Sequence, residues 1–299
     1  MTKSRIDAQG AAFLILVSFL LGANQVVMKL TSEGLSPVFQ SGLRSGLAGV
    51  CIAGWMMMRG IRFPVDRASV GYGLMLGGFF AYEFLCLYIA VDRTSVSHVS
   101  IMFYTMPVHL SVMAHFLIPG ERLTTSRIVG LGLCVIAVAL VMSDRGGQHS
   151  DLTGDLIALA GSFGWAALGI LMRAPVVVRM PGEGALMWQL GVSAPVLLLA
   201  APFFGPLVRD LQPAHVWLMG YQIFAVGIFC FMAWIVLIRI YPAPVVASYS
   251  FLSPVFSVFC AWAILGEALR PSVLLGLALV SAGIYLINRR ARHVPQKVA

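Results

Sequence analysis

Two ionisable side chains interrupt long apolar runs, and their chemistry is the first feature to explain. Arg44 lies within the run at 36–58, and Glu83 lies within the run at 69–90. Charged residues inside membrane-spanning segments are costly, and they commonly serve a binding site, a proton path or an internal ion pair. We therefore expect either an ion pair between Arg44 and Glu83, or a role for Glu83 in carrying protons or binding a substrate ammonium group.

Polar and aromatic side chains near the middle of several apolar runs form a second group. Rings offer surfaces for stacking, while amide and hydroxyl groups can hold the polar end of a small organic molecule. The candidate substrate-binding residues are Asn24, Tyr82, Tyr104, Trp165, Tyr221, Tyr249 and Ser253. For each of them the alternative is a packing or lipid-facing position.

Two prolines and two basic residues occupy matched positions in the two halves of the chain. Pro107 and Pro254 fall near the middle of their apolar runs. A proline there removes an intrahelical hydrogen bond and bends the helix, so both are candidate hinges. Lys29 and Arg173 end corresponding runs, where they either reach the lipid headgroups or gate the two mouths of a transport path.

Motifs for ATP hydrolysis and metal catalysis are absent from the sequence. None of the three lysines belongs to a Walker A loop, and no histidine is followed by glutamate, so H-E-x-x-H does not occur. The five cysteines all lie in apolar runs and form no C-x-x-C pair. We predict no catalytic residues, no enzyme activity, no cofactor and no metal site.

Membrane helices must carry these residues. Of the 299 residues, 59% are hydrophobic and 11% are charged, with a mean hydropathy of +0.90, whereas soluble domains are about 25% charged. Because one spanning helix takes about 20 apolar residues, the lipid bilayer is the main partner and no separate soluble domain fits. The expected spans are 10–30, 36–58, 69–90, 96–118, 126–143, 154–173, 184–203, 214–237, 244–266 and 272–288.

The positive charges sort between alternate loops, which predicts the orientation. Fourteen of the 20 Lys and Arg fall on the side of the N-terminus, five fall on the other side, and Arg44 lies within a span. Positive residues of short loops stay in the cytoplasm. Both termini are therefore expected to be cytoplasmic, and the net charge of +8 reflects topology rather than nucleic-acid binding.

An internal duplication divides the chain. M-P-V at 106–108 and G-E-R-L at 120–123 recur as S-P-V at 253–255 and G-E-A-L at 266–269. The offset is 147 residues for the first motif and 146 for the second, and a repeat of this kind indicates a duplicated structural unit.

Each repeat unit holds five expected helices, at 1–148 and 149–299. Because five is odd, the second unit enters the membrane from the opposite side. The expected fold is an all-α integral membrane protein of ten helices, built as two inverted five-helix repeats around a central cavity. Such repeats can rock to open a central site to each side in turn; duplication of a stable bundle without transport is the alternative.

The ten-helix pattern and the repeated Pro-Val and Gly-Glu-x-Leu motifs resemble the EamA-type members of the drug/metabolite transporter superfamily, over nearly the whole chain. The resemblance implies ten helices around a central cavity, with the fifth and tenth helices peripheral and the first, third, fourth, sixth, eighth and ninth lining the path. Within the family, the aromatic-rich lining looks most like that of a bacterial exporter of aromatic amino acids.

The expected function is therefore secondary export of small metabolites, in particular amino acids including aromatic ones, across a bacterial inner membrane by alternating access. A facilitator or exporter of cationic drugs or other metabolites is one alternative. A polytopic membrane enzyme or lipid-handling protein is another, although it would need acidic or histidine residues clustered at one interface. The expected partners are a small-molecule substrate and lipid, with the chain as a monomer or weak homodimer and with either proton-coupled or facilitated transport.

Overall fold

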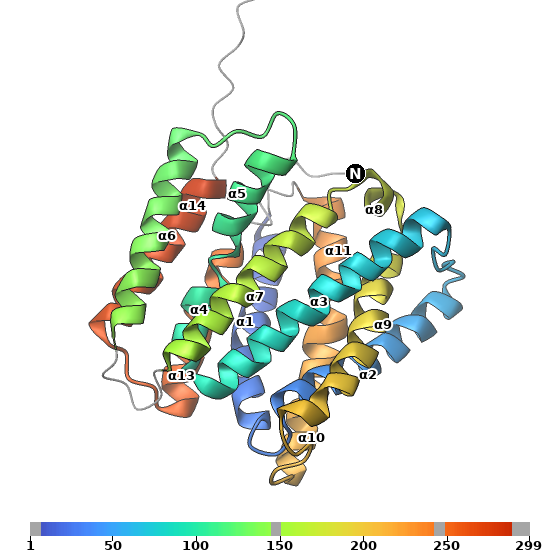
Figure 1. The fold of residues 1–299 in the computed structure, drawn as a ribbon, viewed down its shortest axis with the longest axis horizontal. Helices are drawn as coiled ribbons and strands as arrows, with labels where there is room; N and C mark the ends of the chain where they lie inside the picture. The colour runs from blue at the N-terminus through green and yellow to red at the C-terminus, as the bar shows by residue number, and fades with distance from the viewer. Residues whose placement is uncertain (1–6, 145–150, 242–248, 289–299) are drawn as a thin grey trace, which may run out of the picture.

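The computed structural model describes residues 7–144, 151–241 and 249–288, which are almost entirely helical. The first half contains α1 (Ala8–Thr31), α2 (Pro37–Met58), α3 (Arg67–Arg93), α4 (Val96–Phe103), α5 (Met106–Leu117) and α6 (Thr125–Ser143) (Figure 1). The second half contains α7 (Leu152–Leu171), α8 (Pro175–Arg179), α9 (Gly182–Ala200), η1 (Ala201–Phe204), α10 (Pro213–Gly220), η2 (Tyr221–Cys230), α11 (Phe231–Ile240), η3 (Tyr249–Phe251), α13 (Leu252–Leu265) and α14 (Pro271–Asn288).

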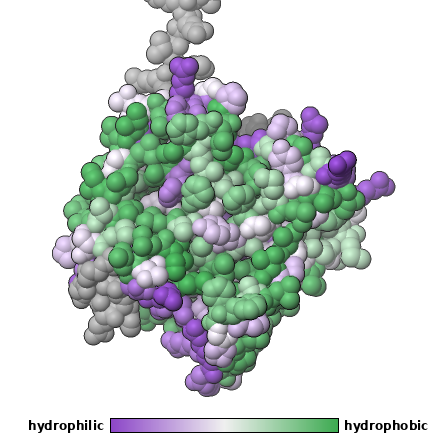
Figure 2. All heavy atoms as spheres, in the orientation of Figure 1, coloured by the Kyte–Doolittle hydropathy of each residue, from purple (hydrophilic) through white to green (hydrophobic). Residues whose placement is uncertain are grey.

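The described helices confirm the expected ten-helix pattern. Seven helices or joined helices are long and apolar enough to cross a membrane, and α13 and α14 are shorter apolar helices. The 22-residue helix α2, which buries Arg44, completes the ten. Figure 2 shows hydrophobic residues over much of the middle of the visible face, as a lipid-facing surface requires. The start of the expected ninth span, residues 244–248, and the chain ends that orient the topology lie outside the described residues.

The fourth span is two helices rather than one bent helix. α4 ends at Phe103 and α5 begins at Met106, so Pro107 occupies the first turn of α5. Pro254 likewise lies in the first turn of α13. The N–H groups of a first turn have no intrahelical partner, so a proline there sacrifices no hydrogen bond. The expected mid-helix bend at Pro107 is thus corrected to a helix break before it, and both prolines begin helices.

The helices of the two halves pack as an inverted repeat requires. α2 packs on α9 and α6 packs on α14, so the second and fifth helices each contact their own repeat counterpart. α1 packs on α13. In the repeat-related contact, α7 packs on α4 and α5. α6 and α14 lie together at one side of the bundle, as expected for peripheral helices (Figure 1).

The two halves are also joined along one end, which we call the α10 end and which includes the loops at 32–36, 94–95 and 205–212. A single antiparallel bridge pairs Leu35 with Val208, and the Arg209 backbone N–H donates to the Gly34 carbonyl at 3.0 Å. In Figure 1 this end is at the bottom, and the N-terminus is at the top. Backbone hydrogen bonds therefore hold the two halves together at the α10 end.

Candidate substrate site

An aromatic cluster of Phe103, Tyr104 and Trp165 joins the two halves inside the bundle. The Trp165 ring of α7 stacks on Phe103 with centroids 5.0 Å apart, and Tyr104 meets Trp165 edge to face at 5.7 Å. Neighbouring residues of a continuous helix point in different directions, but α4 ends at Phe103, so both rings reach Trp165. The Tyr104 hydroxyl also lies beside Ser253 of α13. Three of the predicted residues, Tyr104, Trp165 and Ser253, thus lie in one region.

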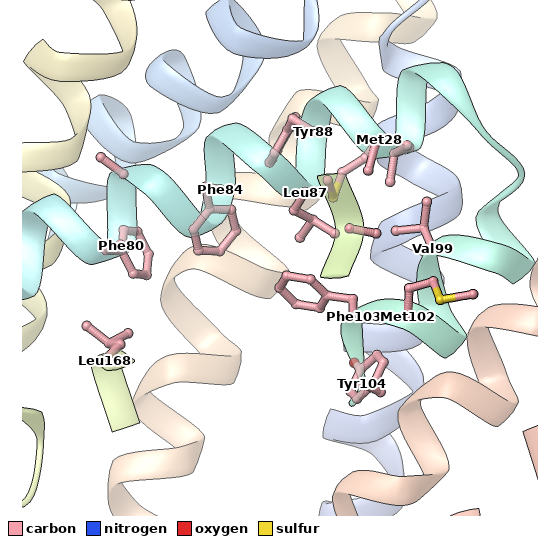
Figure 3. Close-up of a cluster of buried hydrophobic side chains, with 14 of the residues drawn as sticks. Met28, Phe80, Phe84, Leu87, Tyr88, Val99, Met102, Phe103, Tyr104 and Leu168 are labelled. Carbon is pink, nitrogen blue, oxygen red and sulfur yellow. The ribbon is translucent and has the colours of Figure 1, made fainter. Parts of the chain in front are cut away.

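A second set of rings, the α3 row, consists of Phe80, Phe84 and Tyr88 at four-residue spacing. The ring centroids of Phe80 and Phe84 are 4.5 Å apart, and those of Phe84 and Tyr88 are 6.1 Å apart. Figure 3 shows Phe80 and Phe84 projecting from the same side of α3, with Tyr88 farther along the helix. All three rings are buried, so α3 presents an aromatic surface to the interior.

Arg44 and Glu83 are both buried in the interior beside the α3 row. Their exposed fractions are 2% and 4%, and the Arg44 guanidinium lies over the Phe84 ring at 4.3 Å from its centroid, a favourable cation–π arrangement. The Arg44 charge acts on the Glu83 carboxylate. Even so, Arg44 Nε and Nη1 and Glu83 Oε2 have no hydrogen-bond partner among the described residues. The expected ion pair is not formed in this structure.

A buried amide, Gln222 of η2, connects three helices near Arg44. Its Oε1 accepts from the Tyr88 hydroxyl at 2.7 Å, and its Nε2 donates to the Thr31 hydroxyl of α1 at 3.0 Å. Neither Tyr88 nor Gln222 is among the site residues predicted from the sequence. The available signal was a lone side-chain amide within the apolar run at 214–237.

A second buried amide, Gln25 of α1, lies at a junction with α4 and α13. Its Oε1 accepts from Ser100 Oγ at 2.5 Å and from Ser257 Oγ at 3.2 Å. The adjacent predicted residue, Asn24, is buried with its Oδ1 unpartnered among the described residues, and its Nδ2 contacts Met28 Sδ at 3.2 Å. Gln25 thus makes the structural contacts, whereas Asn24 retains a free acceptor.

Gln25→Leu is expected to lower the free energy of unfolding by about 1 kcal/mol, because the two serine hydroxyls lose a buried acceptor. The loss stays small because the Ser100 and Ser257 hydroxyl oxygens lie 2.5 Å apart and can bond to each other when the amide is absent. Detergent unfolding curves provide the measurement. Gln189→Leu is the matched control, because the amide of Gln189 makes only a long contact of 3.9 Å to Met172 sulfur. Equal destabilisation of both variants would contradict the junction's role.

The other predicted tyrosines lie apart from the aromatic cluster. Tyr82 is 42% exposed and borders a shallow surface hollow with Phe163, so its expected cavity position is corrected. The physical reason is that adjacent residues of a helix point about 100° apart, and Glu83 takes the inward direction. The Tyr221 hydroxyl donates to the Leu20 carbonyl of α1 at 2.7 Å, while Tyr249 packs near Tyr241 in a separate cluster.

The two candidate gate residues have different surroundings. Lys29 Nζ donates to the carbonyl oxygens of Val91, Asp92 and Thr94 at 2.7, 3.0 and 3.2 Å. It thereby ties α1 to the C-terminus of α3, where a positive charge is favoured by the helix dipole. Arg173 instead pairs with Glu121 at 2.7 Å and is 44% exposed. A gating role for either residue stays a prediction.

Charged contacts reinforce the joined α10 end. Both oxygens of Glu267 accept hydrogen bonds at the N-terminus of α4, from Val96 N at 2.7 Å, Ser97 N at 3.0 Å and Ser97 Oγ at 2.6 Å. Arg209 forms a two-pronged pair with Asp92 at 2.8 and 3.0 Å. Each contact joins one half of the chain to the other, so polar side-chain contacts connect the two halves at the α10 end.

The residues of the site are mainly aromatic rings, hydroxyl groups and amides. Within the described ranges, no group of three or more His, Cys, Asp or Glu residues is placed to hold a metal ion. The chain matches the EamA-like transporter family over residues 8–143 and 152–289. The chain belongs to this family. The family match confirms the expected resemblance, and it makes this EamA protein a multi-pass membrane transporter.

Named relatives extend over almost the whole chain. A probable amino-acid metabolite efflux pump of Salmonella typhimurium is 28% identical, with 91% of this chain and 92% of the relative covered. A protein of the same name in Escherichia coli is 26% identical, with 91% of this chain and 92% of the relative covered. An S-adenosylmethionine/S-adenosylhomocysteine transporter of Chlamydia muridarum is 22% identical, covering 93% and 91%. One crystal structure shares the fold with a TM-score of 0.64 at 20% identity, covering 94% of this chain and 96% of that one.

Proposed function

We propose that this EamA protein exports amino acids, including aromatic ones, across the bacterial inner membrane by alternating access and without ATP. The observation that carries the proposal is the aromatic cluster, in which Trp165 of one half stacks on Phe103 of the other at 5.0 Å. Rings placed across a repeat interface offer a stacking surface near the middle of the bundle, where inverted-repeat transporters bind their substrates.

The joined α10 end fits one state of such a cycle. Under the positive-inside rule the termini and the loops rich in Lys and Arg are cytoplasmic, which places the α10 end on the outside. The contacts of Glu267 and Arg209 across that end then form the closed outer gate of an inward-facing or occluded state. Export follows when these contacts break and contacts at the opposite end form.

The test is exchange of labelled L-phenylalanine by the purified protein in liposomes. Exchange faster than in protein-free vesicles supports amino-acid transport, and an imposed pH gradient that accelerates uptake identifies proton coupling. Trp165→Leu is expected to slow exchange by about tenfold, because it removes a stacking surface worth about 1 kcal/mol or more. Trp217→Leu, at a ring that is 81% exposed, is the matched control. Equal exchange across a panel of amino acids and amines would reject the proposed substrate class.

A further inference from the structure

One face of α2 carries a buried stripe of polar side chains, each with at least one atom that lacks a hydrogen-bond partner among the described residues, although Gln40 Nε2 donates to the Met28 carbonyl at 3.3 Å. Gln40, Ser41, Arg44 and Ser45 follow the helical spacing of a single face, and each is at most 2% exposed. Gln40 Oε1, Ser41 Oγ, Arg44 Nε, Arg44 Nη1 and Ser45 Oγ have no hydrogen bond within the described part of the chain. Unpaired polar groups are costly in a membrane interior, so a stripe of them calls for a ligand or water.

Glu83 of α3 carries a charge opposite to that of Arg44. Glu83 Oε2 on α3 is buried and unpartnered among the described residues, and the Arg44 charge acts on this carboxylate. Two opposite charges in an interior recover their desolvation cost only through close, well-formed hydrogen bonds. Here the Arg44 guanidinium lies 4.3 Å from the centroid of the ring of Phe84, the residue next to Glu83 in the chain, while Arg44 Nε, Arg44 Nη1 and Glu83 Oε2 have no hydrogen-bond partner among the described residues. A small ligand that carries both charges can give Arg44 and Glu83 a hydrogen-bond partner of opposite charge at the same time.

The eighth membrane helix is irregular at the same place. The segment η2 is a π-helix of ten residues, a form that is rare and frequent at functional sites. Its Gly227 faces α2: a Cβ there would lie 3.2 Å from Ala48 Cβ and 3.9 Å from Arg44 Nε. The absent side chain lets η2 pack closely against α2 beside the guanidinium, while Phe84 covers the guanidinium from α3.

We propose that Arg44 binds the carboxylate and Glu83 binds the ammonium group of a transported α-amino acid. The inference rests on the proposed function, and it assigns to this site the recognition of the charged end of the substrate. A guanidinium offers parallel N–H donors to a carboxylate, and the Glu83 carboxylate accepts from the ammonium. The α3 row supplies aromatic contact beside the charged end of the substrate, in addition to the stacking surface of the aromatic cluster.

The first experiment varies the ligand and leaves the protein unchanged. Liposomes that contain the wild-type protein exchange labelled L-phenylalanine against unlabelled L-phenylalanine, L-phenylalaninamide or phenethylamine. The amide and the amine both lack the carboxylate, and each is expected to compete at least tenfold more weakly, as loss of a charge-assisted hydrogen bond implies. Absence of exchange for every amino acid would refute the proposed function itself. Equal competition by the acid and its amide would refute only the Arg44 assignment.

The second experiment compares Arg44→Gln and Arg44→Lys with Arg62→Gln, an exposed loop residue. Arg44→Gln is expected to slow L-phenylalanine exchange by about 10- to 100-fold while changing phenethylamine uptake less than about threefold. Arg44→Lys, which keeps the charge but loses the planar donor pair, is expected to fall between Arg44→Gln and the wild type. Arg62→Gln is expected to match the wild type.

Three outcomes of the variant experiments overturn the assignment. Equal slowing of L-phenylalanine and phenethylamine by either Arg44 variant shows that Arg44 does not read the carboxylate. If Arg44→Gln and Glu83→Gln each prevent folding but the double variant folds, the two residues form an internal brace instead. If Arg44→Gln alone fails to fold, the test uses Arg44→Lys and the ligand series on the wild-type protein. The assignment is rejected if Arg44→Lys prefers L-phenylalanine over phenethylamine as strongly as the wild type does.

Discussion

Glu267→Ala is expected to lower the free energy of unfolding by about 2–4 kcal/mol, because it removes charged acceptors from three hydrogen bonds at once. Those bonds hold the N-terminus of α4 at Val96 and Ser97, with donor–acceptor distances of 2.6–3.0 Å. The backbone N–H groups of a first turn have no helical partner, and a negative charge there is further favoured by the helix dipole. The bonds also join the second half of the chain to the first.

The matched control is Glu121→Ala, at the repeat-related Gly-Glu motif. Glu121 is 33% exposed and pairs with Arg173 and Arg127 at 2.7 and 3.4 Å. Such half-exposed ion pairs contribute about 0–1 kcal/mol. Unfolding by denaturing detergent, followed by tryptophan fluorescence, measures both variants. Similar losses for the two glutamates would show that Glu267 is an ordinary surface charge and would remove the support for a gate at the α10 end.

The repeat motif illustrates what the sequence determines and what it leaves open. The spacing of G-E-x-L predicts two equivalent positions, and both glutamates lie after the helices that the pattern places there. Their partners differ because the two ends of the bundle differ in the state described. An inverted repeat has identical motifs on opposite membrane faces, and in the alternating-access cycle that we propose only one end is closed at a time. Sequence symmetry therefore cannot reveal which glutamate is engaged.

In the site, too, the position of a residue along the chain could be predicted from the sequence, but the direction of its side chain could not. Apolar run length predicted the spans closely, because the bilayer thickness fixes helix length. Tyr82 and Glu83 lie side by side in sequence, yet one is 42% and the other 4% exposed. Apolar residues cover both the lipid-facing and the inner sides of a membrane helix, so no amphipathic pattern marks the inward face. The inward direction of Phe84 and Gln222 thus required the packed structure.

In the α6–α14 pair, the helix face on which a glycine lies likewise decides whether it contacts the neighbouring helix. A Cβ at Gly130 would lie 2.7 Å from the Gly283 carbonyl oxygen, and a Cβ at Gly283 would lie 2.4 Å from Cys134 Sγ. These glycines allow the two backbones to approach within one chain. Gly132, two residues along α6, meets nothing within 4 Å. Glycine is therefore needed for close helix packing at position 130 but not at position 132.

Gly130→Leu is accordingly expected to lower the free energy of unfolding by about 3 kcal/mol, because the new side chain must push α14 away or adopt a strained rotamer. Gly132→Leu on the exposed face is expected to raise it by about 0.5–1 kcal/mol, since leucine is a better helix former than glycine. Unfolding by denaturing detergent measures both variants on the same scale. A stable Gly130→Leu protein would mean that α14 does not pack against α6 at this distance; the packing between the repeat halves would then have to be looser than the contact at Gly283 implies.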